Sequence, residues 1–364
     1  MTKYKLVQIK LTPITPYFFG KDAFHQLGNK TDYFQHSLDF PQQTTLLGLL
    51  RHKLLRDNGI DLDATHPKNT KNLDIASLIG ASSFQVNNDN INVFGKIKRI
   101  SPCYIIDNNN QKHFYENNET SNGESVLLNE SQDAFLRGTE KYIGKFQFDE
   151  KIGTQDYSNC FHNSIKVGIH KGGVKAKVRD ESYFIMEYKQ LGQKEQIAET
   201  NFNKFKKWSF AFQAILSQDI EVNEAVDIMP MGKERSLFRI ETTILQEEIE
   251  EEKFELKADE ALNSEILKCV LLSDTRLSQG DFNTLSDKCI LQITNKQRVR
   301  YIRRNTQKYY LGEKPTKEAK AFNLIAKGSV LFIKKENKDE VEQLLNKAKD
   351  FKQIGYNYFY FKNA

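Results

Sequence analysis

Strand-like patterns outnumber helix-like patterns in this chain, and the two kinds do not alternate regularly. Residues 4–11 alternate apolar and polar side chains with one register slip, and they predict a strand that the proline-containing stretch 12–16 ends. A Leu-rich stretch from about Thr44 to Arg56 predicts a helix that stops at Asn58-Gly59. Strand patterns dominate until a second amphipathic helix over 338–351. This order indicates an α+β fold with antiparallel sheets rather than a doubly wound parallel sheet.

Strand–helix–strand–strand patterns at each end of the chain fit ferredoxin-like (RRM-like) units. A polar and then basic stretch near residues 200–208 indicates a boundary between an N-terminal domain with long insertions, 1–203, and a C-terminal domain, 204–364. Residues 107–130 are rich in Asn, Glu and Ser and predict a solvated loop, followed by a short helix over 131–144. Further strands are expected at 91–106, 144–153, 164–170, 181–191, 209–216, 266–273, 288–295 and 328–335.

The composition permits a sizeable core and a nucleic-acid partner. The 364 residues are 39% hydrophobic and carry a formal net charge of +5, which is mildly basic. The N-terminus alternates and does not resemble a signal peptide, and no apolar run approaches the roughly 20 residues of a membrane span. We therefore expect a cytoplasmic protein without a membrane segment, whose scattered cysteines are reduced and buried: Cys103, Cys160, Cys269 and Cys289.

Motifs of the common enzyme and cofactor classes are absent from the sequence. It holds no GxGxxG, GxxxxGK[ST], HExxH or GxSxG pattern, and Gly232-Lys233 resembles a phosphate loop only superficially. His162 and His170 flank a predicted strand, but two ligands do not make a metal site. We expect no cofactor and no metal. His25 and His36, in the N-terminal loop, are either polar loop residues or the general base of a ribonuclease.

Basic turns, three of which contain glycine, are the more informative feature. They lie at 168–179, 231–236, 296–305 and 326–330. Backbone amides of such turns can point at phosphates, lysine and arginine neutralise their charge, and aromatic rings stack on unpaired bases. A single basic turn is usually soluble surface. Four of them, on a fold that also builds RNA-binding sheets, favour an RNA partner.

The stretch FPQQTTLLGLLRHKLL, residues 40–55, joins a hydroxyl-rich helix start to a basic turn. Thr44 or Thr45 can cap this helix while its free amides face a phosphate. Gly48 is about 1 kcal/mol less favourable than alanine inside a helix, which indicates close approach by the sheet or by RNA. Arg51 follows at i+3 on the same face. It either contacts RNA or is a buried arginine that ties the loop to the domain.

These motifs occur together and in order in one known family. TPITPYFFGKDAF, FPQQTTLLGLLRHKLL, SIKVGIHKGGVKAKVRDESYFIMEYKQL, PMGKERSLFRIE and KGSVLFIKK span nearly the whole chain. With this set the chain resembles the RAMP superfamily of CRISPR proteins, and more narrowly the third subunit of the type III-B (Cmr) module, which caps the 5′ end of the guide RNA. Two departures are visible. The C-terminal IGYNYFYF offers only Gly355 where many RAMP proteins carry several glycines, and MGKERS replaces a more glycine-rich turn.

The resemblance implies two packed ferredoxin-like domains in a RAMP architecture. It also implies a non-catalytic subunit for antiviral defence that binds the repeat-derived 5′ tag of crRNA. This subunit would dock to the large polymerase-like subunit and to the backbone RAMP subunit, and it would have no small-molecule substrate. Two alternatives stay open. One is a RAMP-type, metal-independent endoribonuclease that processes precursor crRNA. The other is the equivalent capping subunit of a type III-A or type I complex.

The candidate RNA-binding residues fall into two groups. The first rests on the motif match and on the physics of helix termini, whereas the second rests mostly on charge. The first group comprises Gln42, Thr44, Thr45 and Arg51. The second comprises Lys171, Gly172, Gly173, Lys175, Lys177, Arg179, Lys233, Arg235, Lys327 and Ser329.

Overall fold

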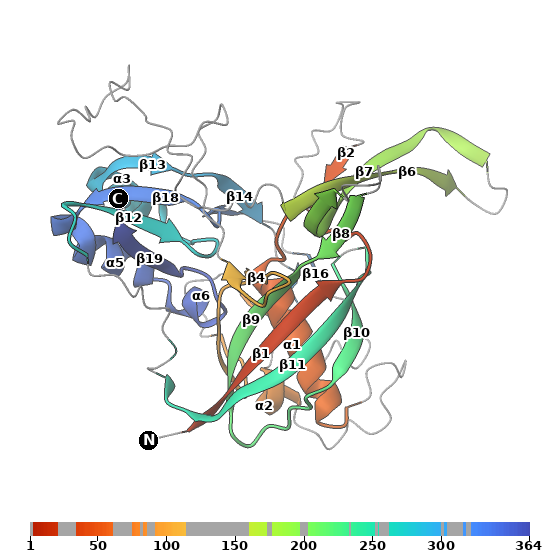
Figure 1. Cartoon of the computed structure of the whole chain (residues 1–364), viewed down its shortest axis with the longest axis horizontal. Helices are drawn as coiled ribbons and strands as arrows, with labels where there is room; N and C mark the ends of the chain where they lie inside the picture. Colours follow the sequence, from red (N-terminus) through yellow and green to blue (C-terminus); the bar gives the residue numbers. More distant parts are fainter. Residues whose placement is uncertain are drawn as a thin grey trace. The chain divides into compact units, whose positions relative to one another are not determined.

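A computed structural model describes the chain in two compact units (Figure 1). Unit 1 comprises Met1–His113, Asp156–Glu250 and Arg298–Ala321, and unit 2 comprises Phe114–Gln155, Glu251–Gln297 and Phe322–Ala364. The described residues are 3–20, 34–60, 75–80, 83–85, 92–113, 160–172, 177–196, 203–232, 234–251, 254, 262–299, 302–303, 316–317 and 322–364. The helix predicted over 131–144, the strand over 144–153 and most of the loop 107–130 lie outside these residues.

Unit 1 is built on a seven-stranded antiparallel sheet with the strand order β10-β11-β1-β9-β4-β5, in which β3 also pairs with β9. Its strands are β1 Tyr4–Pro13, β3 Ile97–Ile100, β4 Tyr104–Ile106, β5 Lys112–His113, β9 Ser209–Ser217, β10 Val226–Met231 and β11 Ser236–Ile249. The predicted strands at 4–11 and 209–216 are β1 and β9. The stretch 91–106 holds the two short strands β3 and β4.

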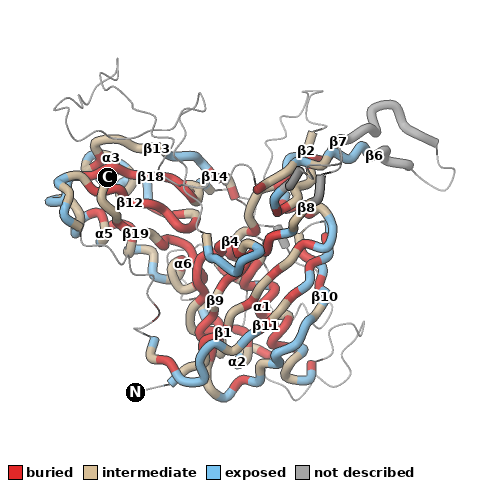
Figure 2. Tube along the Cα trace, viewed as in Figure 1, coloured by how far each residue is buried: buried red, intermediate tan, exposed pale blue. Residues whose placement is uncertain are grey.

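Helix α1, Gln43–Asp57, lies across one face of this sheet (Figure 1). The prediction of a helix from Thr44 to Arg56 is confirmed to within one residue at each end. Its leucines at helical spacing are buried, as are the apolar residues on the inner face of β1 and β9 (Figure 2). Each such side chain contributes about 1.5–3 kcal/mol when it is fully buried. A second helix, α2, spans Ile75–Ile79.

Strand β9 pairs with β1 in the middle of the large sheet of unit 1. With β1 counted first, β3 and β4 second, β9 third and β11 fourth, the order along the sheet is 4-1-3-2, which is that of a split βαβ unit. No helix joins β9 to β11 in the described stretch 218–225, and the β10–β11 hairpin follows directly. Residues 204–250, expected in a C-terminal domain, therefore lie in unit 1.

A second sheet of unit 1 has the order β2-β7-β6, with β8 also paired to β7. Its strands are β2 Phe34–His36, β6 Phe161–Gly172, β7 Lys177–Gln196 and β8 Asn203–Lys207. The predicted strands at 164–170 and 181–191 are β6 and β7, which extend beyond those bounds. Tyr17 joins this sheet to the end of β1, because its N–H donates to the Lys189 carbonyl at 2.8 Å and its carbonyl accepts from the Lys189 N–H at 2.9 Å.

Unit 2 contains the complete element order of a split βαβ unit. Strands β12, β13, β18 and β19 form an antiparallel sheet of order β13-β18-β12-β19, which is again 4-1-3-2. Helix α3 follows β12, and α5 and α6 precede β19. The helix predicted over 338–351 is thus two helices separated at Lys347-Ala348. The bounds are β12 Ile266–Leu271, α3 Gln279–Lys288, β13 Cys289–Ile293, β18 Val330–Lys334, α5 Lys338–Asn346, α6 Lys349–Gln353 and β19 Phe359–Asn363.

Short elements complete the described chain. The 3-10 helix η4 spans Lys335–Asn337 between β18 and α5. Two further pairs of strands are β14 Lys296–Val299 with β17 Phe322–Ile325, and β15 Ile302–Arg303 with β16 Thr316–Lys317.

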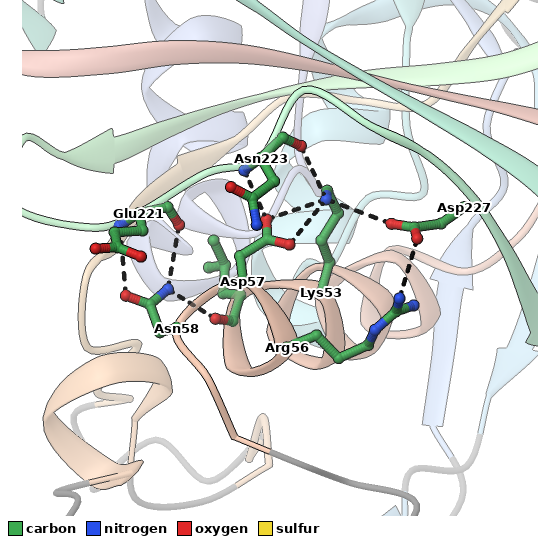
Figure 3. A network of polar contacts seen from close by, with 8 residues as sticks. Lys53, Arg56, Asp57, Asn58, Glu221, Asn223 and Asp227 are labelled. Atoms are coloured by element: carbon green, nitrogen blue, oxygen red, sulfur yellow. Dashed lines mark hydrogen bonds and ion pairs between the residues drawn. The ribbon is translucent and has the colours of Figure 1, made fainter.

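The C-terminal end of α1 is fastened to β10 by a buried lysine (Figure 3). The side chain of Lys53 is 2% exposed, and its Nζ lies 3.0 Å from the Asp57 carboxylate and 3.5 Å from that of Asp227. It also donates to the Asn223 carbonyl at 3.1 Å. Arg56 reaches the other oxygen of Asp227 at 3.0 Å from a more exposed position. Lys53 and Arg56, two basic residues of α1, therefore hold the helix to β10.

We expect Lys53→Met to lower the free energy of unfolding by about 3–5 kcal/mol, because the buried carboxylate of Asp57 loses its cation and Asp227 keeps only Arg56. Arg56→Ala removes an exposed partner of Asp227, and we expect a change of no more than about 1 kcal/mol. Urea denaturation followed by tryptophan fluorescence measures both, since the one tryptophan, Trp208, lies in unit 1. Equal losses in the two variants would contradict this assignment.

Asp274, just after β12, is a titratable group inside unit 2. Its Oδ1 accepts from the Lys327 N–H at 2.8 Å. Burial raises its pKa above the ordinary value of 3.8, and this outweighs the opposing effects of the hydrogen bond and charge of Lys327. Because the folded state holds the proton more tightly than the unfolded chain, this group makes unit 2 less stable as the pH rises above 3.8.

Asp274→Asn keeps a carbonyl oxygen for the Lys327 N–H and removes the charge. We therefore expect the variant to melt at a higher temperature than the wild-type chain at pH 7. The difference should vanish near pH 3, where both side chains are neutral. For each pH unit by which the pKa of Asp274 in the folded chain exceeds its ordinary value, the charged side chain lowers the free energy of unfolding by about 1.4 kcal/mol. A difference in melting temperature that is constant from pH 3 to pH 8 would exclude titration of Asp274 as its cause.

Candidate nucleic-acid interface

The N-terminus of α1 carries no acidic side chain of its own. Gln42 is the N-cap residue, in extended conformation, and its carbonyl accepts from the N–H groups of Thr45 at 2.8 Å and Leu46 at 3.2 Å. Within residues 42–46, all of which the structure describes, no side chain caps the helix and no acidic residue lies in the first turn. The partial positive charge of the helix end is therefore not neutralised by the first turn itself.

The prediction that Thr44 or Thr45 caps α1 is wrong. Both lie inside the first turn and are half-buried, because the helix begins at Gln43. The buried side chain of Gln43 fixes this start. Its Nε2 donates to the Ser101 carbonyl at 2.9 Å, and its Oε1 accepts from the Cys103 N–H at 3.3 Å. Sequence reasoning selected Gln42 and passed over its neighbour, which tethers the helix to the β3–β4 connection.

Gly48 and Arg51 do not share one environment, contrary to the expectation from their spacing. Gly48 is exposed, and among the described residues no atom lies within 4 Å of the place where a Cβ would be. The sheet therefore does not approach it. Arg51 is 6% exposed, and its guanidinium carbon lies 5.8 Å from the centroid of the Phe94 ring. This favours the alternative in which Arg51 is a buried tether.

The aromatic segment before α1 is core rather than surface. Tyr17 is fully buried, and its ring centroid lies 4.9 Å from that of Phe19 and 5.4 Å from that of Phe210. Its hydroxyl donates to the Asp39 carbonyl at 2.8 Å. Burial, with a smaller contribution from the charge of Asp39, raises the pKa of Tyr17 and keeps this donor protonated. The segment thereby fixes the path of the chain into α1.

The β10–β11 turn packs against the same aromatic segment. Gly232 has φ 75°, and a Cβ there would lie 2.5 Å from the Phe18 carbonyl oxygen, so only glycine fits. Arg235 is exposed, and its N–H donates to the Gly232 carbonyl at 3.2 Å. Phe18 also donates its N–H to Ser236 Oγ at 3.2 Å. The candidate Lys233 lies outside the described residues.

Sequence reasoning missed a cation–aromatic pair that borders this turn. Lys166 Nζ lies 4.2 Å from the centroid of the Tyr188 ring, whose other neighbour is the ring of Phe18 at 5.5 Å. Burial, and then the nearby charge of Glu234, raises the pKa of Tyr188. The register of β6 and β7 places Lys166 diagonally to Tyr188. The alternation of residues in these two strands could therefore have indicated that the two side chains share one face.

The other candidates are not gathered at α1. In the backbone register, Lys171 and Gly172 lie opposite Val178 and Lys177 near the closed end of the β6–β7 hairpin, and Arg179 follows in β7. Gly173 and Lys175 lie outside the described residues. The structure thus separates the basic hairpin from the helix start.

Lys327 and Ser329 belong to unit 2 and precede β18. Ser329 is 1% exposed, and its Oγ accepts from the Asn295 N–H at 3.2 Å, which makes it part of the fold. The aromatic residues that an RRM would use to stack bases are also inside. Phe332 and Tyr358 lie on the face of the sheet opposite the main helix-side cluster, and they are 2% and 5% exposed. Neither of these two rings is therefore exposed for base stacking.

The two sequence departures from the family pattern have a shared structural basis. Arg235, in the turn with few glycines, has φ 53°, and Asn357, in the C-terminal stretch, has φ 57°. Asn357 is fully buried. Its side chain accepts from the Arg276 N–H at 2.8 Å and donates to the Leu345 carbonyl at 3.0 Å. Non-glycine residues thus adopt the left-handed conformation that glycine usually supplies.

His36 is the one candidate general base within the described residues. Its Nδ1 lies 2.6 Å from the Glu187 carboxylate, and its side chain is 58% exposed. Burial acts to raise the pKa of Glu187, but hydrogen bonds with His36 and Lys189 lower it overall. A carboxylate that holds one ring nitrogen orients the imidazole as in many general bases. His25 lies outside the described residues.

Among the described residues, no group of three or more His, Cys, Asp or Glu side chains is placed to hold a metal ion. No helix there is long and apolar enough to span a membrane. The four cysteines are free and buried, as expected.

Comparison with known proteins places the chain in a family. A model of the family described as CRISPR-associated protein (Cas_Cmr3) matches residues 136–363, more than half of the chain. The search of curated proteins found no match. Similar solved chains come from a cryo-EM structure of "Type III-B Cmr-beta bound to cognate target RNA" (12% identity, TM-score 0.49, covering 98% of this chain and 99% of that chain) and from one that also holds AMPPnP (14%, 0.47, 98% and 96%). The family match decides the assignment: this chain belongs to the Cas_Cmr3 family of CRISPR-associated proteins.

Proposed function

We propose that this chain is a non-catalytic RNA-binding subunit of a cytoplasmic type III-B CRISPR (Cmr) complex. In this proposal it holds the repeat-derived 5′ tag of crRNA and docks to the large polymerase-like subunit and to the backbone RAMP subunit. We further infer that it has the RAMP architecture of two ferredoxin-like domains, with β10 in the place of the second helix of the first domain. The 4-1-3-2 strand order in both units supports that inference.

The observation that carries the proposal is the N-terminus of α1, together with the exposed Gly48 in the next turn of the helix. The first turn has no acidic residue and no side-chain cap, and Gly48 leaves the surface one turn further on without a side chain. Helix N-termini bind phosphate through backbone N–H groups and the helix dipole. The half-buried hydroxyls of Thr44 and Thr45 supply further donors. The 2′-hydroxyl of RNA offers them a partner that DNA lacks.

Two features of unit 1 extend this interface. Arg235 is exposed on the β10–β11 turn, which packs on the segment that leads into α1. The pair of Lys166 and Tyr188 combines a cation with an aromatic ring, both of which RNA-binding surfaces use. The basic end of the β6–β7 hairpin adds positive charge further away. Because it is buried, Arg51 supports the helix rather than contacting a phosphate.

Arg235→Ala should weaken binding of tag-bearing crRNA several-fold, because one exposed phosphate contact is lost. The dependence of log K on log salt should become shallower by about 0.7, the value for one phosphate of a single strand. Arg56→Ala removes the same charge at the opposite end of α1 and should leave both quantities unchanged. Filter binding with tagged and tagless RNA at several salt concentrations measures them. A wild-type chain without preference for tagged RNA would exclude the proposed function.

The same interface would serve the equivalent capping subunit of a type III-A or type I complex, because the contacts with the RNA end do not depend on the partner. Membership of the Cas_Cmr3 family favours type III-B. Co-expression with the neighbouring subunits, followed by identification of the proteins that co-purify, separates these assignments.

A second candidate function is a metal-independent endoribonuclease that processes precursor crRNA. The contact between His36 and Glu187 at 2.6 Å favours it, since the carboxylate orients an exposed imidazole. General-base catalysis alone contributes only about 10²–10⁴-fold, so a second catalytic group is required. Neither the sequence nor the contacts of His36 supply one among the described residues.

If the chain is such an enzyme, it should cut repeat RNA in EDTA, and His36→Ala should lower the rate at least about 100-fold. His52→Ala, which changes a histidine of α1, serves as the matched control. Gel analysis of labelled repeat RNA measures the rate. Intact RNA after prolonged incubation with the wild-type chain would exclude this candidate.

A further inference from the structure

Strand β10 leaves one edge of the large sheet open. It pairs with β11 on one side and with no strand on the other among the described residues. Pro230 shows which backbone groups face the open side, because proline in a sheet directs its nitrogen away from the ladder. Backbone direction alternates along a strand, so Ile228 and Val226 point their N–H and C=O groups to that same side.

The residues with these open backbone groups also carry exposed apolar side chains. Val226 is 58% exposed and Ile228 is 64% exposed. Pro230 is exposed as well, and it lies opposite Leu237 of β11, which is 42% exposed. Figure 2 shows the exposed residues along β10. We name Val226, Ile228, Pro230 and Leu237 the β10 edge patch.

Contacts on the inner face of β10 hold this edge in place. The alternate residues Met229 and Met231 are 2% and 4% exposed and belong to the core. Asp227 faces the same side and is bonded by Lys53 and Arg56 of α1 (Figure 3). The open backbone groups are therefore preorganised, and a ligand strand would not have to order them.

The opposite edge of the same sheet shows the usual protection. There β5 spans only Lys112–His113, and His113 is bonded to Asp107 at 2.9 Å. Short, charged edge strands of this kind prevent unwanted pairing. β10 has three times that length, and its exposed outer residues carry no charge. The one residue of β10 that opposes pairing is Pro230, which lacks an N–H group; the outward N–H groups of Val226 and Ile228 stay open.

The charge of the surface identifies the class of partner. Arg239 lies opposite Ile228 in the register, and its Nε is 3.4 Å from the carboxylate of Glu241, so this pair carries no net charge for a phosphate backbone. The exposed cation Arg235 lies in the turn beyond the end of β10. Open N–H and C=O groups together with alternating apolar side chains match an extended polypeptide, as in strand addition to a sheet edge. RNA has neither a peptide backbone to pair with these groups nor apolar side chains to pack on the patch.

We propose that the β10 edge patch receives an extended apolar segment of another protein subunit, which pairs with β10 as an additional strand. The inference rests on the proposed function in that the chain must assemble with protein subunits. It names the surface and the mode of contact, which the family match does not provide.

The test uses the full-length chain co-expressed with the large polymerase-like and backbone subunits. Ile228→Lys places a charge on the edge, and we expect at least a tenfold lower yield of one of these subunits on purification through this chain. Leu245→Lys is the matched control, since Leu245 is 40% exposed on β11 but lies beyond the Ser236–Glu241 stretch that pairs with β10. It should assemble as the wild-type chain does. Both free variants should keep the wild-type melting temperature, because both side chains are exposed.

Ile228→Cys gives a second readout in the assembled complex. The native cysteines Cys103, Cys160, Cys269 and Cys289 are all buried, so a thiol-directed photo-crosslinker reacts selectively at the new position. We expect crosslinks to a segment of a partner subunit in which apolar residues alternate, whereas Leu245→Cys should give none there. Mass spectrometry of the crosslinked peptides identifies the segment.

Several results would overturn the inference. They are wild-type assembly of Ile228→Lys, crosslinks to RNA alone, and a free chain that dimerises through this edge and becomes monomeric in Ile228→Lys. RNA preference measured on the isolated chain reports separately on the proposed function. If tag preference is present but Ile228→Lys assembles normally, only the inference fails. If the wild-type chain neither prefers tagged RNA nor retains a subunit, both fail.

Discussion

The ammonium group of Lys53 determines how unit 1 is organised, because it joins α1 to β10 from within the protein. A buried ion pair adds little net stability compared with apolar packing, but breaking it leaves a buried charge uncompensated, which favours the arrangement that keeps its partners together. Here that arrangement fixes the C-terminal end of α1, while Gln43 fixes the N-terminal end. The helix is thus held at both ends, and its first turn and the edge of β10 become defined surfaces of one body.

Strong periodicity made β1 and α1 predictable, because each buries one side of a regular pattern. β9 was predictable as a short apolar run, and it is buried on both faces. β11 was missed because its alternation fades into an acidic stretch, whose exposed residues give no periodic signal. Helix α3 buries only Leu285, so its apolar stripe is too sparse to detect. The polar stretch at 200–208, interpreted as a boundary, is largely β8. Long-range pairing places β9 beside β1, and local composition does not reveal such pairing.

The stretches of sequence that form the candidate site were predictable, whereas the burial and the backbone conformation of their single residues were not. The helix start after Pro41 and the basic turns were found from residue types, and the structure keeps Arg235 and the first turn of α1 on one unit. Charge does not reveal burial, however. Ser329 was selected from a basic turn although it is buried, and for Arg51 the sequence left RNA contact and burial open. The left-handed conformations of Arg235 and Asn357 likewise cannot be read from residues that usually avoid them.

Gly48 has a consequence for how the free and assembled states differ. In the isolated chain its missing side chain has no structural use, since an added methyl group would meet no described atom, and alanine would stabilise the helix by about 1 kcal/mol. The free subunit is therefore less stable than its own fold allows. A partner that lies directly against this bare stretch of backbone would offset that deficit. The position thus links the stability of the subunit to the completeness of the particle that contains it.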